Sequence, residues 1–368
     1  MKKDLYRRTV TTRRRSALLV AAIAAVGTSL IATPAGPAAA DPGTLPAQAF
    51  TDVAYAAPVP ATTRGNLLDI YLPERKADKP LPLFIFTEGS AWFADTGKSS
   101  AAAWAAKLNP LGYAVAGVSV RSSLQVQFPG QLNDIKAAIR YLRANADQYD
   151  IDPGRFALAG FSSGAWTAAI AGVTNGVGPD LEGSEGATGV SSRVQAVVSI
   201  AAPVAFRLMD SQATQYSTLQ HGTPFSPESM VTGCTGYATG IMDPACTNAE
   251  RANPLNYVTP DDPPFLIFHA TRDQALPPGQ SQVLFDALAA NCVGAELHLV
   301  EGPDHTYSYL EEPGAQAVVG QTVEKVNASS CHRSEFDGLR PGTVPSYDLI
   351  ASFLDRTIGA GAEARRPR

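Results

Sequence analysis

Strand-like apolar segments alternate with helical segments along most of this 368-residue chain. The sequence predicts strands over residues 67–73, 81–89, 113–120, 155–160, 194–203, 264–270 and 296–302, and helices over 101–108, 131–149, 163–172, 281–291 and 346–357. Most of these strands are apolar throughout, which indicates burial on both faces, and the helices between them allow parallel pairing. The pattern therefore predicts an α/β fold with a mostly parallel central sheet flanked by helices.

Three stretches interrupt this order: residues 174–192, 204–263 and 316–345. Structureless loops of such length are uncommon and often functional. We expect them to form loops or a small cap over the strand ends, with the cap or loop insertion at about 204–263. The predicted folded domain covers residues 61–360, after a Pro-rich lead (41–60) and before a basic tail (361–368).

The first 40 residues have the composition of a secretory signal. A basic segment (1–15) precedes an apolar, Ala-rich segment (16–32), and three alanines stand immediately before Asp41. The apolar segment is short and leads into Pro and Gly, which argues against a retained membrane anchor. The pattern predicts an exported, extracellular protein and leaves the choice between the Sec and Tat routes open.

The chain that remains after this signal is acidic. Residues 1–40 hold seven of the 29 Lys and Arg residues and one of the 34 Asp and Glu residues, so 22 basic and 33 acidic residues remain and the net charge is −11. Such a surface repels nucleic acid and anionic lipid, and neither is expected as a partner. No later apolar run is long enough to cross a bilayer. The sequence sets no oligomeric state.

Four cysteines follow the signal: Cys234, Cys246, Cys292 and Cys331. An even number of cysteines in an exported protein favours disulfides. Three pairings are possible, and Cys234–Cys246 with Cys292–Cys331 is preferred because each pair brackets a loop that closure would stabilise. A zinc site is not expected, since the chain has no Cys-x-x-Cys and no nearby His pair.

Residues 160–164 read Gly-Phe-Ser-Ser-Gly and lie between a predicted strand and a predicted helix. A serine on such a turn projects its Oγ from the sheet, and the flanking positions must be small because a Cβ there would collide with neighbouring backbone. The pattern predicts Ser162 as a nucleophile. The turn also places the Ser163 N–H at a helix N-terminus, where it can face a developing oxyanion. A chance match in a Gly-rich chain is the alternative.

A nucleophilic serine needs a base, and His305 is the best placed of five histidines because it follows directly after a predicted strand. The others lie within apolar strands, in the cap or beside a predicted disulfide: His269, His298, His221 and His332. The candidate acid is Asp273, which follows the strand at 264–270 and gives the chain order serine, acid, histidine. A carboxylate there would fix the imidazole tautomer.

Three other carboxylates compete for the role of the acid. Asp304 is adjacent to the histidine, but a directly adjacent side chain usually points away. Asp261 and Asp262 precede the strand and fall at its other end. A second oxyanion donor is expected from Gly89, Ser90 and Ala91, whose small side chains let backbone N–H groups approach a substrate. We expect the N–H of Ser90 or Ala91 to act with that of Ser163, a plain turn being the alternative.

Four tracts of the chain resemble the α/β-hydrolases, and more narrowly the carboxylesterases related to bacterial feruloyl and acetyl (xylan) esterases. They read EGSAWF, FPGQLNDIKAAIRYLRANADQYDIDPGRFALAGFSSG, NPLNYVTPDDPPFLIFHATRDQALPPGQS and VEGPDHTY. The resemblance implies the α/β-hydrolase fold, with Ser162 as nucleophile, Asp273 as acid and His305 as base. Relatives commonly show His-Gly-Gly-Gly-Trp where this chain has Glu88-Gly89-Ser90-Ala91-Trp92, and often Ala-Gly-Gly after the serine where it has Ser163-Gly164-Ala165.

The function implied is that of a secreted serine carboxylesterase acting through an acyl-enzyme on short-chain acyl esters. Acetyl or feruloyl groups on plant polysaccharide are the substrates that the resemblance suggests, and no metal or organic cofactor is called for. Two alternatives remain open. An exported serine peptidase of the same fold would cleave peptide amides, and a non-catalytic hydrolase-like binding protein would have lost at least one of the three catalytic side chains.

Overall fold

A computed structural model describes residues 44–45, 47–76, 79–302, 304–311 and 320–359. The predicted signal (1–40) and the basic tail (361–368) lie outside the described residues. No helix in the described ranges is long and apolar enough to cross a membrane.

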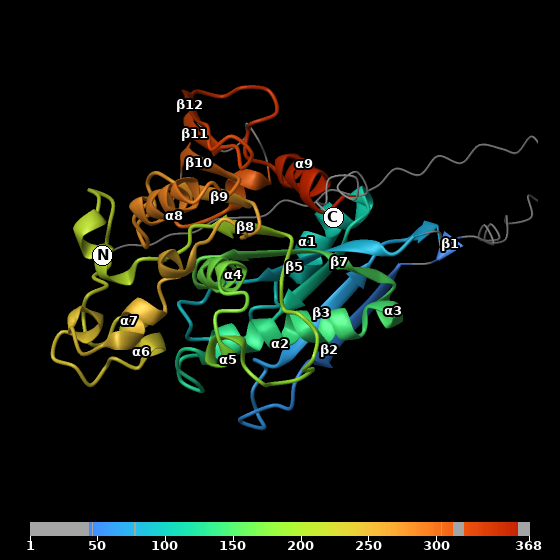
Figure 1. Cartoon of the computed structure of the whole chain (residues 1–368), viewed down its shortest axis with the longest axis horizontal. Helices are drawn as coiled ribbons and strands as arrows, with labels where there is room; N and C mark the ends of the chain where they lie inside the picture. Colours follow the sequence, from blue (N-terminus) through green and yellow to red (C-terminus); the bar gives the residue numbers. More distant parts are fainter. Residues whose placement is uncertain (1–43, 46, 77–78, 303, 312–319, 360–368) are drawn as a thin grey trace, which may run out of the picture. The chain divides into compact units, whose positions relative to one another are not determined.

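The described residues form a mixed sheet of ten strands in the order β12-β11-β10-β9-β8-β7-β5-β6-β3-β2 (Figure 1). Its centre is parallel throughout. The parallel strands are β6 (Ala114–Val118), β5 (Leu81–Thr87), β7 (Ile151–Phe161), β8 (Ala196–Ile200), β9 (Phe265–Ala270) and β10 (Ala295–Glu301). Burial on both faces explains their nearly continuous apolar sequences.

Helices cover both faces of this sheet. One face packs against α2 (Gly130–Ala144), α4 (Ser163–Val173) and α8 (Gly279–Ala290), and the other against α1 (Ala101–Leu108) and α9 (Tyr347–Thr357). Side chains of β5 alternate between these two cores, with Leu83 and Ile85 in one and Phe84 and Phe86 in the other. The helix expected over 131–149 divides into α2 and the short α3 (Ala146–Tyr149).

The edges of the sheet differ from the prediction. Residues 316–345, expected as loop or cap, contain β11 (Gly320–Val326) and β12 (Arg333–Asp337), which pair antiparallel beside β10. The Pro-rich lead contains β2 (Gln48–Ala54), which pairs with β3 (Leu67–Leu72). The outer strands β2 and β12 are largely exposed, so neither has the continuous apolar sequence by which buried strands are recognised. A separate pair joins β1 (Thr44–Leu45) to β4 (Arg75–Lys76).

The long insertions contain only short helices. The predicted cap at 204–263 holds α6 (Pro227–Thr232) and α7 (Thr247–Arg251) with several 3₁₀ turns, and residues 174–192 hold α5 (Pro179–Glu182). A disulfide between Cys234 and Cys246 joins the end of α6 to the start of α7. A second, between Cys292 and Cys331, ties the end of α8 to the β11–β12 connection. This is the pairing that was preferred from the sequence.

A nearly buried ion cluster on β10 makes the stability of this sheet edge sensitive to pH. Glu296 Oε1 accepts from His298 Nε2 at 2.7 Å and from Lys325 Nζ at 2.9 Å. Burial would raise the pKa of Glu296, but the hydrogen bonds and charges of His298 and Lys325 lower it from 4.5 to about 2. A carboxylate whose pKa is lower in the folded chain stabilises the fold above its unfolded pKa and loses that contribution as the pH falls.

Glu296→Gln should therefore flatten the pH dependence of stability. Between about pH 4.5 and 2 the free energy of unfolding of the wild type should fall more than that of the variant, by on the order of 1–3 kcal/mol. Urea denaturation of both proteins at several pH values measures this difference. Parallel curves across the whole range would show that Glu296 is not linked to folding.

Candidate active site

Loops that follow four parallel strands meet at one edge of the sheet, as parallel pairing requires. Ser162 follows β7, Asp273 follows β9 and His305 follows β10, while the segment 88–97 follows β5. Residues far apart in the sequence therefore converge at the carboxyl ends of the strands.

Ser162 occupies a strained turn between β7 and α4. Its φ is 57° and its ψ is −126°, a conformation that L-residues rarely adopt. Its N–H donates to the Ile200 carbonyl at 2.9 Å, which fixes the turn. A Cβ on Gly160 would lie 2.3 Å from the Gly164 carbonyl oxygen, and one on Gly164 would lie 2.1 Å from the Thr87 oxygen. The two glycines are thus required by backbone contact, as the motif predicts.

Three side chains form a continuous hydrogen-bonded row. His305 Nε2 lies 2.9 Å from Ser162 Oγ, and His305 Nδ1 lies 2.7 Å from Asp273 Oδ2. The other carboxylate oxygen, Oδ1, accepts from the N–H groups of Ala275 and Leu276, each at 2.8 Å. Because the fully buried carboxylate orients Nδ1–H, Nε2 is left to accept the serine proton.

Asp273 has a second imidazole partner that the sequence analysis missed. His269 Nε2 lies 3.3 Å from Asp273 Oδ2 and 3.2 Å from the Leu276 carbonyl oxygen, and its Nδ1 lies 2.7 Å from Ser281 Oγ. Burial would raise the pKa of Asp273, but hydrogen bonds and charge from His269 and His305 hold it well below its usual range. The carboxylate therefore stays ionised. The spacing of four residues between His269 and Asp273 was the available signal.

The competing acids do not contact the imidazole. Asp304 Oδ1 accepts from the backbone N–H groups of Gln274 at 3.2 Å and of His305 at 2.7 Å, and so holds two loops together. Asp262 accepts from Thr259 at the other end of β9. Of the remaining histidines, His332 is exposed and His298 belongs to the ion cluster on β10.

The three N–H groups expected as oxyanion donors differ in their hydrogen bonds. The Ser90 N–H donates to Ser163 Oγ at 2.9 Å, so this amide is already engaged. Within the described ranges, the N–H groups of Ala91 and Ser163 have no hydrogen-bond acceptor. Ala91 has a φ of 51°, which turns the segment sharply beside Ser162. Ala91 and Ser163 are therefore the two donors that remain available to a substrate oxygen.

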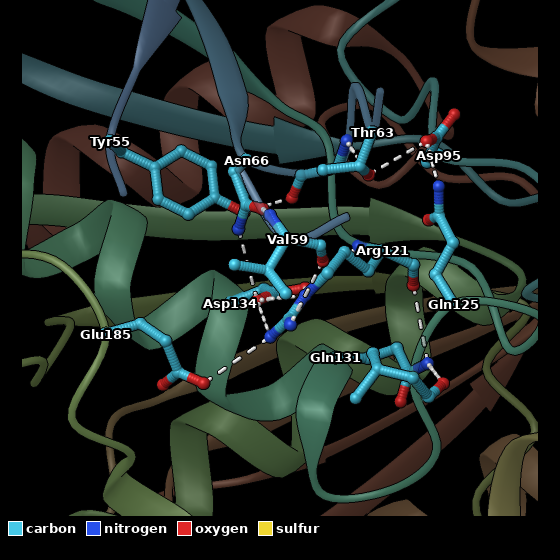
Figure 2. A network of polar contacts seen from close by, with 12 residues as sticks. Tyr55, Val59, Thr63, Asn66, Asp95, Arg121, Gln125, Gln131, Asp134 and Glu185 are labelled. Atoms are coloured by element: carbon cyan, nitrogen blue, oxygen red, sulfur yellow. Dashed lines mark hydrogen bonds and ion pairs between the residues drawn. The ribbon is translucent and has the colours of Figure 1, made fainter. Parts of the chain in front are cut away.

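A polar network around Arg121 and Asp134 reaches the segment 88–97 at Asp95 (Figure 2). The Arg121 guanidinium contacts the Asp134 carboxylate through Nη2 at 2.6 Å and Nε at 2.9 Å. Just beyond Arg121, the Ser123 N–H donates to the Trp92 carbonyl at 2.7 Å, and Gln125 Nε2 donates to Asp95 at 2.7 Å. The pair Arg121–Asp134 thus anchors a loop that in turn fixes residues 92–95.

Ser163→Ala tests whether the Ser163 hydroxyl positions the segment 88–97, which carries the Ala91 N–H. The substitution removes the acceptor of the Ser90 N–H and, at 3.4 Å, of the Trp92 N–H. A small displacement of catalytic donors can cost on the order of 10²-fold in rate, so we expect kcat to fall about 10- to 100-fold with little change in KM. Steady-state kinetics measure this change. An unchanged kcat would mean that this hydroxyl does not support the segment.

A cavity of about 220 Å³ opens beside Ser162 and His305. Its wall is mainly apolar, and two polar side chains of the cap, His221 and Glu228, also line it. Apolar lining residues are Trp92, Phe161, Pro203, Leu219, Pro227 and Leu276. Among the described residues no group of three or more His, Cys, Asp or Glu side chains is placed to hold a metal ion.

Comparison with known proteins assigns the family. The BD-FAE family model matches residues 68–288, which include Ser162 and Asp273. The chain belongs to the BD-FAE family. A solved structure described as a truncated form of carbohydrate esterase from gut microbiota is 34% identical to this BD-FAE chain and has a TM-score of 0.60. The aligned region covers 70% of this chain and 89% of the carbohydrate esterase chain. The α/β-hydrolase fold expected from the sequence is thereby confirmed.

Two curated relatives of this BD-FAE chain are mycobacterial esterases. Esterase LipC of Mycobacterium tuberculosis (strain ATCC 25618 / H37Rv) is 27% identical over 302 residues, covering 81% of this chain and 64% of LipC. Esterase LipQ of the same strain is 28% identical over 242 residues, covering 64% of this chain and 53% of LipQ. The chain spans about half to two thirds of the length of the curated relatives that it matches most strongly.

Proposed function

We propose that this BD-FAE protein is a carboxylic ester hydrolase that works through a serine acyl-enzyme. The observation that supports this most strongly is the hydrogen-bonded row from Asp273 through His305 to Ser162 Oγ, at 2.7 and 2.9 Å. The esterase names of its relatives support the same reaction class.

The proposed reaction has two steps. His305 Nε2 takes the Ser162 proton as Oγ attacks the ester carbonyl, and the N–H groups of Ala91 and Ser163 stabilise the resulting oxyanion. Protonated His305 then donates to the departing alcohol. In the second step His305 takes a proton from water as the water oxygen attacks the acyl carbon, and it then donates this proton to Ser162 Oγ as the bond to the acyl carbon breaks and the acid is released. Asp273 stays ionised and stabilises the imidazolium in both steps.

Short acyl esters carried on carbohydrate are the proposed substrates, with acetyl and feruloyl groups on plant polysaccharide as the specific candidates. The carbohydrate esterase among the similar structures supports this class. The small, mainly apolar cavity fits a short acyl or single-ring group. Two disulfides favour an oxidising compartment, in agreement with the proposed export.

A substrate panel tests the proposal. The purified protein is incubated with 4-nitrophenyl acetate, acetylated xylan, methyl ferulate and a peptide 4-nitroanilide, and release of acid or chromophore is followed. Hydrolysis of one or more esters with negligible peptide cleavage is expected. Preferential peptide cleavage would identify a peptidase, and binding without turnover of any substrate would identify a non-catalytic protein. Either result would overturn the proposed function.

A further inference from the structure

Glu228, in the cap helix α6, lines the same cavity as Ser162 and takes no part in the proposed reaction. Its side chain is only 2% exposed. One carboxylate oxygen, Oε1, lies 3.0 Å from His221 Nδ1. The other, Oε2, is buried and has no hydrogen-bond partner in the described structure. Buried polar atoms are nearly always paired, so an orphan oxygen on a residue that lines an active-site cavity points to a ligand.

His221 occupies one oxygen of the Glu228 carboxylate. His221 Nε2 lies 3.0 Å from the Ala275 carbonyl oxygen, which can only accept, so Nε2 carries a proton. Burial would lower the pKa of His221, but its hydrogen bond to Glu228 and the charge of that carboxylate raise it above its usual value. Nδ1 then donates to Oε1, which leaves Oε2 as a buried acceptor without a donor in the described structure.

Several contacts hold this pair in place. Asp210 accepts from the backbone N–H groups of His221 and Gly222, at 2.7 and 2.8 Å. The Ser226 hydroxyl accepts from the Ser229 N–H at the start of α6, and the disulfide from Cys234 fixes the chain just beyond its end. Because the backbone on both sides is anchored, Oε2 is held near one position before substrate arrives.

We propose that Glu228 Oε2 accepts a hydrogen bond from a hydroxyl group of the substrate, which makes Glu228 a specificity-determining residue. This inference rests on the proposed ester hydrolysis and adds the requirement that the preferred ester carries a hydroxyl group. The neighbouring cavity wall at Pro227, Leu219 and Leu276 is apolar, so a substrate without that hydroxyl leaves Oε2 unpaired. A site built around such an acceptor discriminates strongly against the deoxy analogue.

The hydroxyl group can lie on the acyl or on the alcohol part of the ester, and matched substrates separate these sources. The acyl pair is methyl 4-hydroxycinnamate and methyl cinnamate. The alcohol pair is a monoacetylated methyl xyloside and its deoxy analogue that lacks a neighbouring hydroxyl. For the wild type we expect kcat/KM to favour the hydroxylated member of one pair by about 10- to 100-fold, as a hydrogen bond to a charged group predicts. Ratios near one in both pairs would overturn the inference.

Glu228→Met links any preference to this residue. The methionine side chain is of similar length and has no carboxylate oxygen, so the Oε2 acceptor is removed. The hydroxyl preference should fall at least fivefold, with thermal unfolding measured alongside. Glu250→Met, at a cap carboxylate that is 54% exposed and outside the cavity, is the matched control and should keep the wild-type ratio. A wild-type ratio in folded Glu228→Met would refute the assignment.

These outcomes are separable from those of the proposed function. Wild-type activity on 4-nitrophenyl acetate, which lacks a hydroxyl, reports ester hydrolysis alone. Activity there with no hydroxyl preference removes only the role of Glu228. Absence of activity on every ester removes both the proposed function and the inference that rests on it.

Discussion

Ser162→Ala should reduce kcat for 4-nitrophenyl acetate by a factor on the order of 10⁴–10⁶ and leave the fold intact. The serine Oγ lies 2.9 Å from His305 Nε2, so its removal takes away the group to be acylated. The alanine Cβ occupies the place of the serine Cβ, and the turn needs no other change. Stopped or steady-state hydrolysis assays and thermal unfolding measure the two expectations.

Ser352→Ala, on the exposed surface of α9, is a matched control for this substitution and should retain wild-type kinetics. A folded Ser162→Ala protein that hydrolyses the ester at the wild-type rate would exclude a serine acyl-enzyme at this position. A fall of only a few fold would also contradict the proposal, because residual catalysis by oxyanion stabilisation alone lies far below the full rate.

Gly164→Ala should destabilise the protein by at least about 3 kcal/mol or prevent folding. The added Cβ would meet the Thr87 carbonyl oxygen at 2.1 Å and the Glu88 oxygen at 3.0 Å. These are backbone atoms at the end of the central strand β5, which pairs on both sides and cannot move without disturbing β6 and β7. Chemical denaturation measures the loss.

Gly236→Ala provides the comparison. A Cβ at this position meets nothing within 4 Å, so the free energy of unfolding should stay within about 0.5 kcal/mol of the wild type. Equal stability of the two alanine variants would show that the turn around Ser162 can widen. The tight packing on which the nucleophile geometry depends would then be absent.

The parallel centre of the sheet was predictable because strands that are buried on both faces have nearly continuous apolar sequences. Strands such as β8 and β9 are buried at every residue, and their apolar runs were recognised within three residues of their ends. The exposed β12 has no apolar run, because its residues are held by backbone pairing with β11 and not by packing in a core. Polar edge strands therefore resembled loops.

The site was predictable to the extent that it depends on local geometry and chain order. Ser162 was identified from the residues on either side of it, and the structure brings the predicted Asp273 and His305 to it. The contacts of His221 with Glu228 required the fold of the cap, which has no regular period. Likewise, the Ser163 hydroxyl accepts from the Ser90 N–H and so decides which of the Ser90 and Ala91 amides is available. This contact could not be read from the sequence.

The claim that Ser162 Oγ becomes acylated is tested most directly by trapping it. The protein is incubated with a stoichiometric amount of diethyl 4-nitrophenyl phosphate, and the modified residue is located by peptide mass spectrometry while residual esterase activity is measured. We predict one diethylphosphoryl group per chain, on Ser162, with activity lost in proportion to labelling. Labelling at a different residue in step with the loss of activity, or full activity in protein modified at Ser162, would contradict the account.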